Sequence, residues 1–234
     1  PTWTTWAQYK ADIDETKVLA MARAIRAHRY PGATLEIDDR WQRAYGDTLF
    51  DPLRFPDPAG LVSKLAELGF ATTLWTTPFL APDSLNGREA ASRGFVLADS
   101  EGRPQSVRWW QGEAWLLDLS QAAARDWWTE KLATLQRETG IAGYKFDAGE
   151  ANFLPAVPRP PMEASAFSHA WAGSRQKAVS CASVRLGRSS SAGGEGAAVV
   201  KNGRALSSVA WAMSAAMRAA SALNEGGSDA PAVK

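Results

Sequence analysis

Apolar residues in the first 150 positions follow two spacings, short runs typical of strands and repeats of three or four residues typical of helices. The runs are bounded by Pro, Gly and Asp, which commonly end strands. They are rich in Trp, Thr, Tyr, Ile and Phe, the residue types that strands favour. Strands are therefore predicted over residues 3–9 (WTTWAQY), 33–37 (ATLEI), 70–76 (FATTLWT) and 141–146 (IAGYKF).

Helices are predicted between these strands, where apolar residues recur at helical spacing. Asp14, Asp57 and Ser120 stand before the helices, and their side chains can cap a first turn. Gly69 and Gly140 stand where the second and third helices would end. The predicted buried stripes are, in chain order, Val18, Met21, Ala22 and Ile25; Leu61, Leu65 and Leu68; and Trp128, Leu132 and Leu135.

The alternation of strands and helices predicts an α/β fold with a parallel sheet. Four strand–helix units correspond to about the first half of a (β/α)8 TIM barrel, which in full takes ~250 residues. An incomplete barrel is therefore expected from this chain of 234 residues, with a hairpin inside the glycine-punctuated stretch 94–118. A doubly wound sheet is the alternative, but no G-x-G-x-x-G motif follows the first strand.

Residues 172–234 differ in composition from residues 1–171. They contain no Ile, Phe or Tyr, and Ala, Ser and Gly make up 35 of their 63 residues. Such a segment buries too little apolar surface for an ordinary core, and only residues 205–223 have the alanine content of a helix. Two parts are therefore predicted, a partial barrel over 1–171 and a tail over 172–234 that is disordered or encoded out of frame.

Composition and charge exclude several classes of function. The formal net charge is +1, so electrostatics favours neither nucleic acid nor an anionic membrane as a partner. No apolar stretch approaches the ~20 residues of a membrane span. No basic-then-apolar leader follows Pro1, and the compartment and oligomeric state stay open. With the single cysteine Cys181 and two histidines, His28 and His169, neither an internal disulfide nor a thiolate or multi-histidine metal centre is expected.

Charged side chains stand at the carboxyl ends of the second and fourth predicted strands, where the active sites of parallel barrels lie. Asp38 and Asp39 end one strand, and Lys145 and Asp147 end the other. Because side chains alternate along a strand, Lys145 and Asp147 should point to the same side. There Lys145 would keep Asp147 ionised and nucleophilic, unless the two form a structural ion pair. The alternative for the two neighbouring aspartates is a turn that caps a helix.

Tryptophan is abundant, with 11 residues in the chain, and several accompany these strand ends. Trp75 ends the third strand, and Trp109 and Trp110 precede the third helix. An indole ring presents a flat apolar face to the C–H side of a sugar, and its N–H can bond a hydroxyl. Carboxylates with tryptophans therefore favour a carbohydrate site, against the alternative that the tryptophans form a hydrophobic clamp.

Five segments taken together resemble glycoside hydrolase family 31, and within it the branch of the myogenesis-regulating glycosidase and its bacterial relatives. They are YPGATLEIDDRW, AYGDTLFDPLRFPDP, GFATTLWTTPF, VRWWQGEAWLLDLS and GYKFDAGEANFLP, in the family's order from Pro1 to about Pro155. The resemblance implies a (β/α)8 barrel that hydrolyses α-glycosides with retention through a covalent intermediate. It implies a carbohydrate substrate and neither a cofactor nor a metal.

The resemblance also implies roles for single residues. Asp147 in KFDAGE matches the family's nucleophile, and Lys145 resembles the lysine that precedes the nucleophile by two positions in related α-galactosidase families. Asp38 and Asp39 resemble the acidic pair that binds the galactose 4- and 6-hydroxyls in those families. An α-galactoside is therefore the first expected substrate and an α-glucoside the second. The tryptophans expected to contact the substrate or to wall its pocket are Trp110, Trp75 and Trp6.

The sequence departs from the family at the second carboxylic acid, which in retaining hydrolysis stands ~5–5.5 Å from the nucleophile. After Asp147 the only aspartate is Asp229, in a context that does not match, so the general acid/base is unassigned. The chain is therefore expected to represent a retaining α-glycosidase that is truncated at its start and frameshifted near residue 172. A non-catalytic sugar-binding module and an inert fragment are the alternatives. Unpaired edges on the first and fourth strands predict poor stability.

Overall fold

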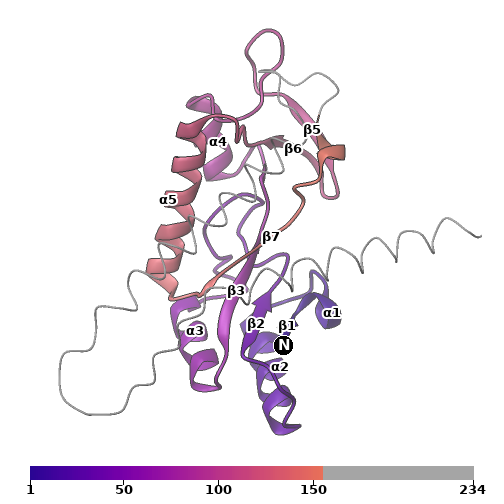
Figure 1. The fold of residues 1–234 in the computed structure, drawn as a ribbon, viewed down its shortest axis with the longest axis vertical. Coiled ribbons are helices and arrows are strands. Elements are labelled where there is room, and N and C mark those ends of the chain that lie inside the picture. Colours follow the sequence, from indigo (N-terminus) through magenta and orange to yellow (C-terminus); the bar gives the residue numbers. More distant parts are fainter. Residues whose placement is uncertain (155–234) are drawn as a thin grey trace, which may run out of the picture. The chain divides into compact units, whose positions relative to one another are not determined.

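The computed structural model describes residues 1–154, which contain a four-stranded parallel sheet (Figure 1). The strands lie side by side in the order in which they follow one another along the chain. The chain therefore advances in one direction around the sheet, as in a TIM barrel, and does not reverse as in a doubly wound sheet. The strands are β1 (Thr2–Thr4), β2 (Thr34–Ile37), β3 (Ala71–Thr76) and β7 (Gly143–Phe146).

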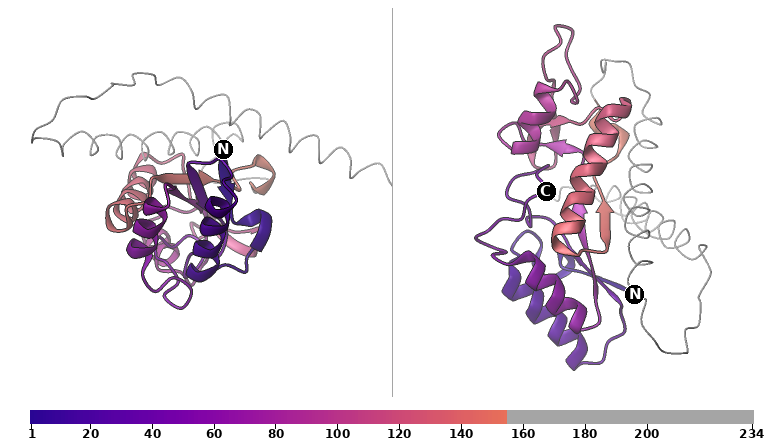
Figure 2. Two further views of the ribbon diagram at one scale, coloured as in Figure 1. Left: turned by 90° about the horizontal axis from the view of Figure 1, so that it is seen from below. Right: turned by 90° about the vertical axis from the view of Figure 1, so that its left-hand side faces the viewer.

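The connecting helices cover one face of this sheet (Figure 2). The helix α3 contacts both α2 and α5. The predicted stripes are buried, with Leu61 and Leu65 of α3 enclosed beside Leu74 of β3, whereas Leu68 at the end of α3 is only partly buried. This apolar layer fixes the sheet from one side. The helices are α2 (Glu15–Ala27), α3 (Pro58–Glu67) and α5 (Ala122–Thr139).

Two of the three predicted helix caps are confirmed. The Asp14 and Asp57 carboxylates each accept a backbone hydrogen bond from the first helical turn, at 2.8 and 2.9 Å. The third is wrong, because the Ser120 hydroxyl donates to Asp118 Oδ1 at 2.5 Å and α5 begins without a side-chain cap. Gly140 ends α5 in the left-handed region, at a φ of 80°, as predicted.

The first strand is shorter than the sequence predicted. It ends at Thr4, and Trp6–Tyr9 form a single helical turn, α1. The change occurs at Thr5, whose N–H still donates to β2 while its carbonyl accepts a hydrogen bond at 2.9 Å from the last residue of α1. The strand-forming residue types in this segment are therefore overridden by a local turn.

A small antiparallel sheet lies between β3 and α5 in the chain, with β6 as its middle strand. It contains the hairpin that the sequence predicted within residues 94–118. The sequence prediction missed α4 (Leu85–Ser92), whose first turn is capped by Ser84, and it missed β4. A 3-10 turn, η1 (Ala151–Phe153), follows β7 and contacts the hairpin. The strands of this sheet are β4 (Phe79–Leu80), β5 (Ser106–Trp109) and β6 (Gly112–Leu116).

Several predictions fall outside the described residues. They concern the tail over 172–234 with its helix over 205–223, the thiol of Cys181, and Asp229. Within residues 1–154, β1 and β7 are the edge strands of the parallel sheet. In that same part of the chain, none of the helices is long and apolar enough to cross a membrane.

Candidate active site

The face of the parallel sheet opposite the helices is polar. The register aligns Thr4 of β1 with Glu36 of β2 and with Thr73 of β3, and it aligns Trp75 of β3 with Lys145 of β7. Residues in register on neighbouring strands point to the same face of a sheet. This face, called the inner face below, therefore carries the charged residues that the sequence placed at the strand ends.

Lys145 connects the two acidic strand ends. Its Nζ lies 2.6 Å from Asp38 Oδ2 and 3.5 Å from Asp147 Oδ2, so Lys145 and Asp147 point to the same side, as strand alternation predicted. Burial acts to lower the pKa of Lys145, but the hydrogen bond and charge of Asp38 outweigh it, and the pKa is raised. The Lys145 and Asp147 side chains are 36% and 23% exposed, whereas the Asp38 side chain is 3% exposed.

β2 and β7 end in the same local geometry. Asp38 Oδ1 accepts a hydrogen bond from the N–H of the next residue at 2.8 Å, and Asp147 Oδ1 does so at 3.0 Å. Nearby, Arg40 and Ala148 adopt the left-handed region, with φ of 72° and 59°, which costs about 1 kcal/mol or more for a residue other than glycine. No helix begins after Asp39 until α3, so the helix-cap alternative is wrong. Each turn fixes one carboxylate oxygen and leaves Oδ2 facing Lys145.

Trp75 holds the Asp147 carboxylate from a second direction. Its indole Nε1 donates a hydrogen bond to Asp147 Oδ2 at 2.9 Å, and its ring is only 3% exposed. The backbone N–H of Ala148 already binds the other oxygen. Both oxygens of Asp147 are therefore engaged, and the orientation of the carboxylate is defined.

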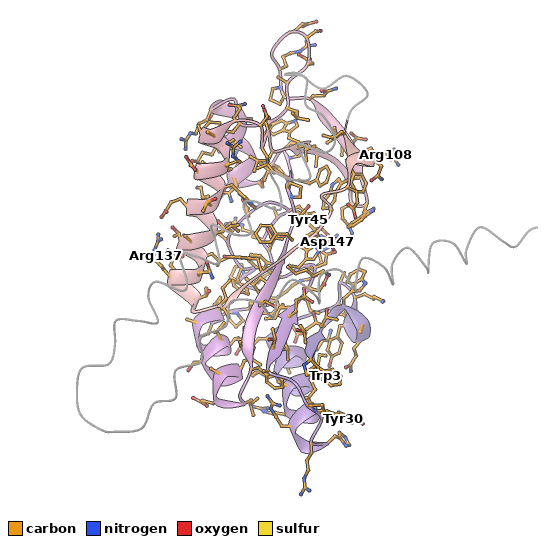
Figure 3. All side chains as sticks on the ribbon, viewed as in Figure 1. Trp3, Tyr30, Tyr45, Arg108, Arg137 and Asp147 are labelled. Atoms are coloured by element: carbon orange, nitrogen blue, oxygen red, sulfur yellow. The ribbon has the colours of Figure 1, made fainter. Side chains whose placement is uncertain are left out.

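Tyr45, which the sequence prediction missed, lies at the same end of the sheet as Asp147 (Figure 3). Its hydroxyl donates to Asp39 Oδ2 at 3.0 Å, while Asp39 Oδ1 is buried without a hydrogen-bond partner. Burial raises the pKa of Asp39, and the hydrogen bond from Tyr45 and the charge of Arg40 partly oppose this. Burial also raises the pKa of Tyr45, so its hydroxyl stays protonated and able to donate.

Aromatic rings form a wall beside these carboxylates. Tyr45 packs edge-on against Trp75 and Trp109, with ring centres 6.2 and 5.1 Å apart. Trp109 is 5% exposed and stacks at 4.6 Å on a phenylalanine of β4, so it acts as the hydrophobic clamp. Its neighbour Trp110 is 55% exposed and meets Phe153 of η1 edge-on at 5.4 Å. The two adjacent tryptophans therefore differ, and only Trp110 presents a large surface to solvent.

Trp6 lies in α1, directly after the carboxyl end of β1. It is 39% exposed, and the Lys10 ammonium lies 5.1 Å from the centre of its ring, within the range of a cation–π contact. This position is at the strand-end edge of the sheet, and the role of Trp6 as a pocket wall stays a prediction.

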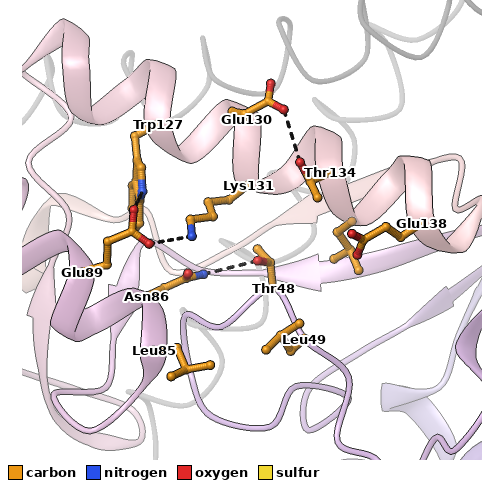
Figure 4. A pocket seen from close by; sticks show the side chains of 11 residues that line it. Thr48, Leu49, Leu85, Asn86, Glu89, Trp127, Glu130, Lys131, Thr134 and Glu138 are labelled. Carbon is orange, nitrogen blue, oxygen red and sulfur yellow. Dashed lines mark hydrogen bonds and ion pairs between the residues drawn. The ribbon is translucent and has the colours of Figure 1, made fainter.

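A separate groove of about 610 Å³ lies between α4 and α5 (Figure 4). None of the predicted site residues lines it. Glu89 accepts hydrogen bonds from Trp127 Nε1 and Lys131 Nζ, both at 2.6 Å, so these polar groups satisfy one another. The candidate site is therefore at the strand ends and not in this groove. Among the described residues, no group of three or more His, Cys, Asp or Glu side chains is arranged to hold a metal ion.

Comparison with known proteins identifies the family. Residues 2–221 match the model of the glycosyl hydrolases family 31 TIM-barrel domain. The chain belongs to glycoside hydrolase family 31. The parallel sheet of the described residues is accordingly part of this family's TIM barrel. The match also includes residues of the segment 172–234, which lie outside the described part.

Two curated proteins and one solved structure are similar to this chain. The chain is 37% identical over 191 residues to the myogenesis-regulating glycosidase of Mus musculus, covering 80% of this chain and 27% of that protein. It is 30% identical to the alpha-xylosidase XylQ of Lactiplantibacillus pentosus, over 63% of this chain and 19% of that protein. The structure of the alpha-galactosidase TtGalA of Thermus thermophilus superposes with a TM-score of 0.61 at 25% identity, covering 76% of this chain and 36% of that one. The chain thus spans 27% or less of the length of these two curated relatives.

Proposed function

We propose that this chain carries the sugar-binding part of a retaining α-glycosidase site, with Asp147 as the nucleophile. The supporting observation is the way in which the Asp147 carboxylate is held. One oxygen accepts from Trp75 and faces Lys145, and the other accepts from the backbone N–H of Ala148. A partly exposed carboxylate with a defined orientation, beside a charged lysine, suits attack on an anomeric carbon. Membership of a glycoside hydrolase family supports this reaction class.

In the proposed first step, an Asp147 oxygen forms a bond to the anomeric carbon of the bound sugar. The bond from that carbon to the leaving oxygen breaks, and this oxygen takes a proton from a carboxylic acid ~5–5.5 Å from the nucleophile. Water then attacks the same carbon, releases Asp147, and gives its proton to the second carboxylate. No residue of the described part is assigned as this acid, so substrates whose leaving group needs little protonation suit this chain best.

We infer that the preferred sugar is galactose, with glucose as the second candidate. Asp38 is fixed by Lys145, and the buried Oδ1 of Asp39 has no hydrogen-bond partner and so keeps an unused acceptor. Two adjacent carboxylates can accept from the axial 4-hydroxyl and the 6-hydroxyl of galactose, whereas glucose presents an equatorial 4-hydroxyl. Similarity to the Thermus thermophilus alpha-galactosidase supports this order. The tryptophans proposed as stacking surface and walls are Trp110, Trp75 and Trp6.

Initial rates with 2,4-dinitrophenyl α-galactoside, α-glucoside and α-xyloside test the proposed function, because this leaving group needs little acid assistance. We expect the galactoside to react fastest and Asp147→Asn to abolish the reaction. Asp83→Asn, at an exposed aspartate before α4, is the matched control and should behave as the unsubstituted chain. Hydrolysis by Asp147→Asn at the original rate would overturn the nucleophile assignment. A faster reaction with the glucoside or the xyloside would contradict galactose as the preferred sugar and assign glucose or xylose in its place.

The unassigned acid favours a second candidate, a sugar-binding module without catalysis. The strand-end groups Asp38, Asp39 and Lys145, together with Trp110 of the hairpin, would then bind galactose reversibly. Calorimetric titration with galactose, together with the rate measurements, separates the candidates. Galactose binding without hydrolysis would support the sugar-binding module. If neither binding nor hydrolysis is detected, the inert fragment is supported.

We propose in addition that the partial barrel ends near residue 171 and that the tail over 172–234 is a separate segment, although the family match extends to residue 221. Reading the coding DNA beyond codon 171 in all three frames tests this. The tail would be identified as a frame error if another frame encodes an Arg followed by an Asp that is flanked by aromatic residues. Further strand–helix alternation should then follow in that frame. A genuine tail would favour the sugar-binding module or the inert fragment.

A further inference from the structure

Glu36 is a buried carboxyl group that the proposed reaction does not use. It lies on the inner face of β2, two residues before Asp38, and is 3% exposed. The hydroxyl of Thr4, its partner in register on β1, donates a hydrogen bond to Glu36 Oε2. The other oxygen, Oε1, is buried and has no hydrogen-bond partner. An ionised carboxylate at this position would be costly, because it has lost its hydration and is only half satisfied.

The charged groups that act on Glu36 are Asp38 on its own strand and Lys145 on β7. The neighbouring strands place the Thr4 hydroxyl and Thr73 beside it. Asp38 disfavours a second negative charge, and it can accept a hydrogen bond from Glu36 only when Glu36 carries a proton. Lys145 acts in the opposite direction, but its ammonium is already engaged by Asp38 at 2.6 Å.

The balance of these contributions favours the protonated form of Glu36. Burial is the largest and raises the pKa of Glu36, and the charge of Asp38 raises it further. The hydrogen bond from Thr4 and the charge of Lys145 lower it in part, and the pKa lies at about 8 instead of the ordinary 4.5. At pH 7 the group is therefore mostly neutral, and the oxygen without a partner can be the one that carries the proton.

We propose that Glu36 is a positioning residue, which holds a proton at neutral pH and donates it in a hydrogen bond to Asp38, so that Asp38 stays oriented against Lys145. The consequence for sugar binding rests on the proposed function, because Asp38 contacts a sugar only there. When Glu36 loses its proton, the donated hydrogen bond disappears and a new negative charge competes with Asp38 for Lys145. We therefore expect the affinity for galactose to fall about tenfold between pH 7 and pH 9.

The proton itself is tested by carbon NMR of the full chain labelled at the glutamate side-chain carboxyls. The resonance that disappears in Glu36→Gln is that of Glu36, and it should titrate with a midpoint near 8. Glu113→Gln, at an exposed glutamate of β6, is the matched control, and in it the Glu36 resonance should keep the midpoint that it has in the unsubstituted chain. A Glu36 midpoint near its ordinary value of 4.5 would overturn the proposal.

The positioning role is tested by the pH dependence of galactose affinity. The unsubstituted chain and Glu113→Gln should show the alkaline fall. Glu36→Gln should not, because its amide donates a hydrogen bond at every pH. Glu36→Leu fills similar space without a donor, so we expect about tenfold weaker binding throughout the range. An alkaline fall of the same size in Glu36→Gln would contradict the role.

The two experiments also separate this inference from the proposed function. If galactose binds to neither the unsubstituted chain nor its variants, the assignment of the sugar site fails. The carboxyl titration still decides whether Glu36 carries the proton. The Lys145 side chain gives a further readout, because its nitrogen resonance should shift near pH 8 in the unsubstituted chain and remain unchanged there in Glu36→Gln.

Discussion

The two faces of the parallel sheet consist of alternate residues of the same strands, yet their chemistry is opposite. On the helix face, Leu35, Ile37 and Leu74 are fully buried among apolar side chains of the helices. The opposite, inner face of the same sheet carries Glu36 and Lys145, which interact with other ionisable groups. Burial of each large apolar side chain stabilises a fold by about 1.5–3 kcal/mol, whereas buried ion pairs contribute little net stability. Substitutions on the helix face should therefore lower mainly the free energy of unfolding, and substitutions on the inner face should lower mainly activity or sugar binding.

The largest expected effect is on the inner face, at the nucleophile. Asp147→Asn should lower the rate of aryl galactoside hydrolysis by about a thousandfold or more, because no covalent intermediate can form. The same change should lower the free energy of unfolding by only about 1–2 kcal/mol, since the amide keeps the hydrogen bond from Ala148 but leaves the Trp75 indole N–H without its acceptor. Rates and urea unfolding of the same samples check both statements. A large loss of unfolding free energy would show that Asp147 mainly stabilises the fold.

Neighbouring substitutions on β3 compare the two faces directly. Leu74→Ala empties a fully buried position and should cost about 2–5 kcal/mol of unfolding free energy, whereas Thr73→Ala should cost less than about 1 kcal/mol. Within residues 1–154, β1 and β7 are edge strands, and we predict marginal stability, so Leu74→Ala should fail to fold while Thr73→Ala folds. Circular dichroism and limited proteolysis measure this. Cooperative thermal unfolding of a soluble monomer at high temperature would count against the predicted marginal stability.

The pH dependence of stability shows the cost of the carboxyl group on the inner face. Glu36 keeps its proton in the folded chain up to about pH 8, whereas in the unfolded chain it loses the proton near 4.5. Folding therefore takes up a proton between these values, and stability should fall as pH rises, by up to about 1.4 kcal/mol per pH unit. Urea unfolding across this range should show a shallower fall in Glu36→Gln. Parallel profiles for the two proteins would refute the assignment.

The smallest expected effect concerns the aromatic wall. Trp110→Ala should weaken galactose binding by about three- to tenfold with little change in stability, because the ring is 55% exposed. Trp110→Tyr keeps an aromatic face and should retain most of the affinity. Titration calorimetry measures both variants. Equal affinity for the unsubstituted chain and Trp110→Ala would remove Trp110 from the sugar site.

The features that sequence predicted correctly depend on local periodicity. Helical spacing placed Leu61 and Leu65 on the buried side of α3, because every third or fourth residue of a helix faces the same way. Strand alternation placed Lys145 and Asp147 on one side of β7 for the equivalent reason. Order along the chain gave the order of the parallel strands, because short crossovers join neighbours.

The features that sequence missed are not marked by any local periodicity. Tyr45 lies in an irregular connection, and only the fold brings its hydroxyl to Asp39. Glu36 stands inside a short predicted strand, and its pKa is raised chiefly by burial and by the charge of Asp38, which the strand pattern does not reveal. The short helix α4 contains few apolar positions, although the capping residue Ser84 is a signal that could have revealed it.

The most direct test of Asp147 as the nucleophile is covalent trapping with a fluorinated α-galactosyl fluoride. Its fluoride leaves without protonation as the carboxylate bonds to the anomeric carbon, so the unassigned acid is not needed. Peptide mass spectrometry of the full chain should find one added fluorosugar on Asp147, and none in Asp147→Asn. An adduct on another residue, or no adduct in a chain that binds galactose, would contradict the proposed glycosidase site.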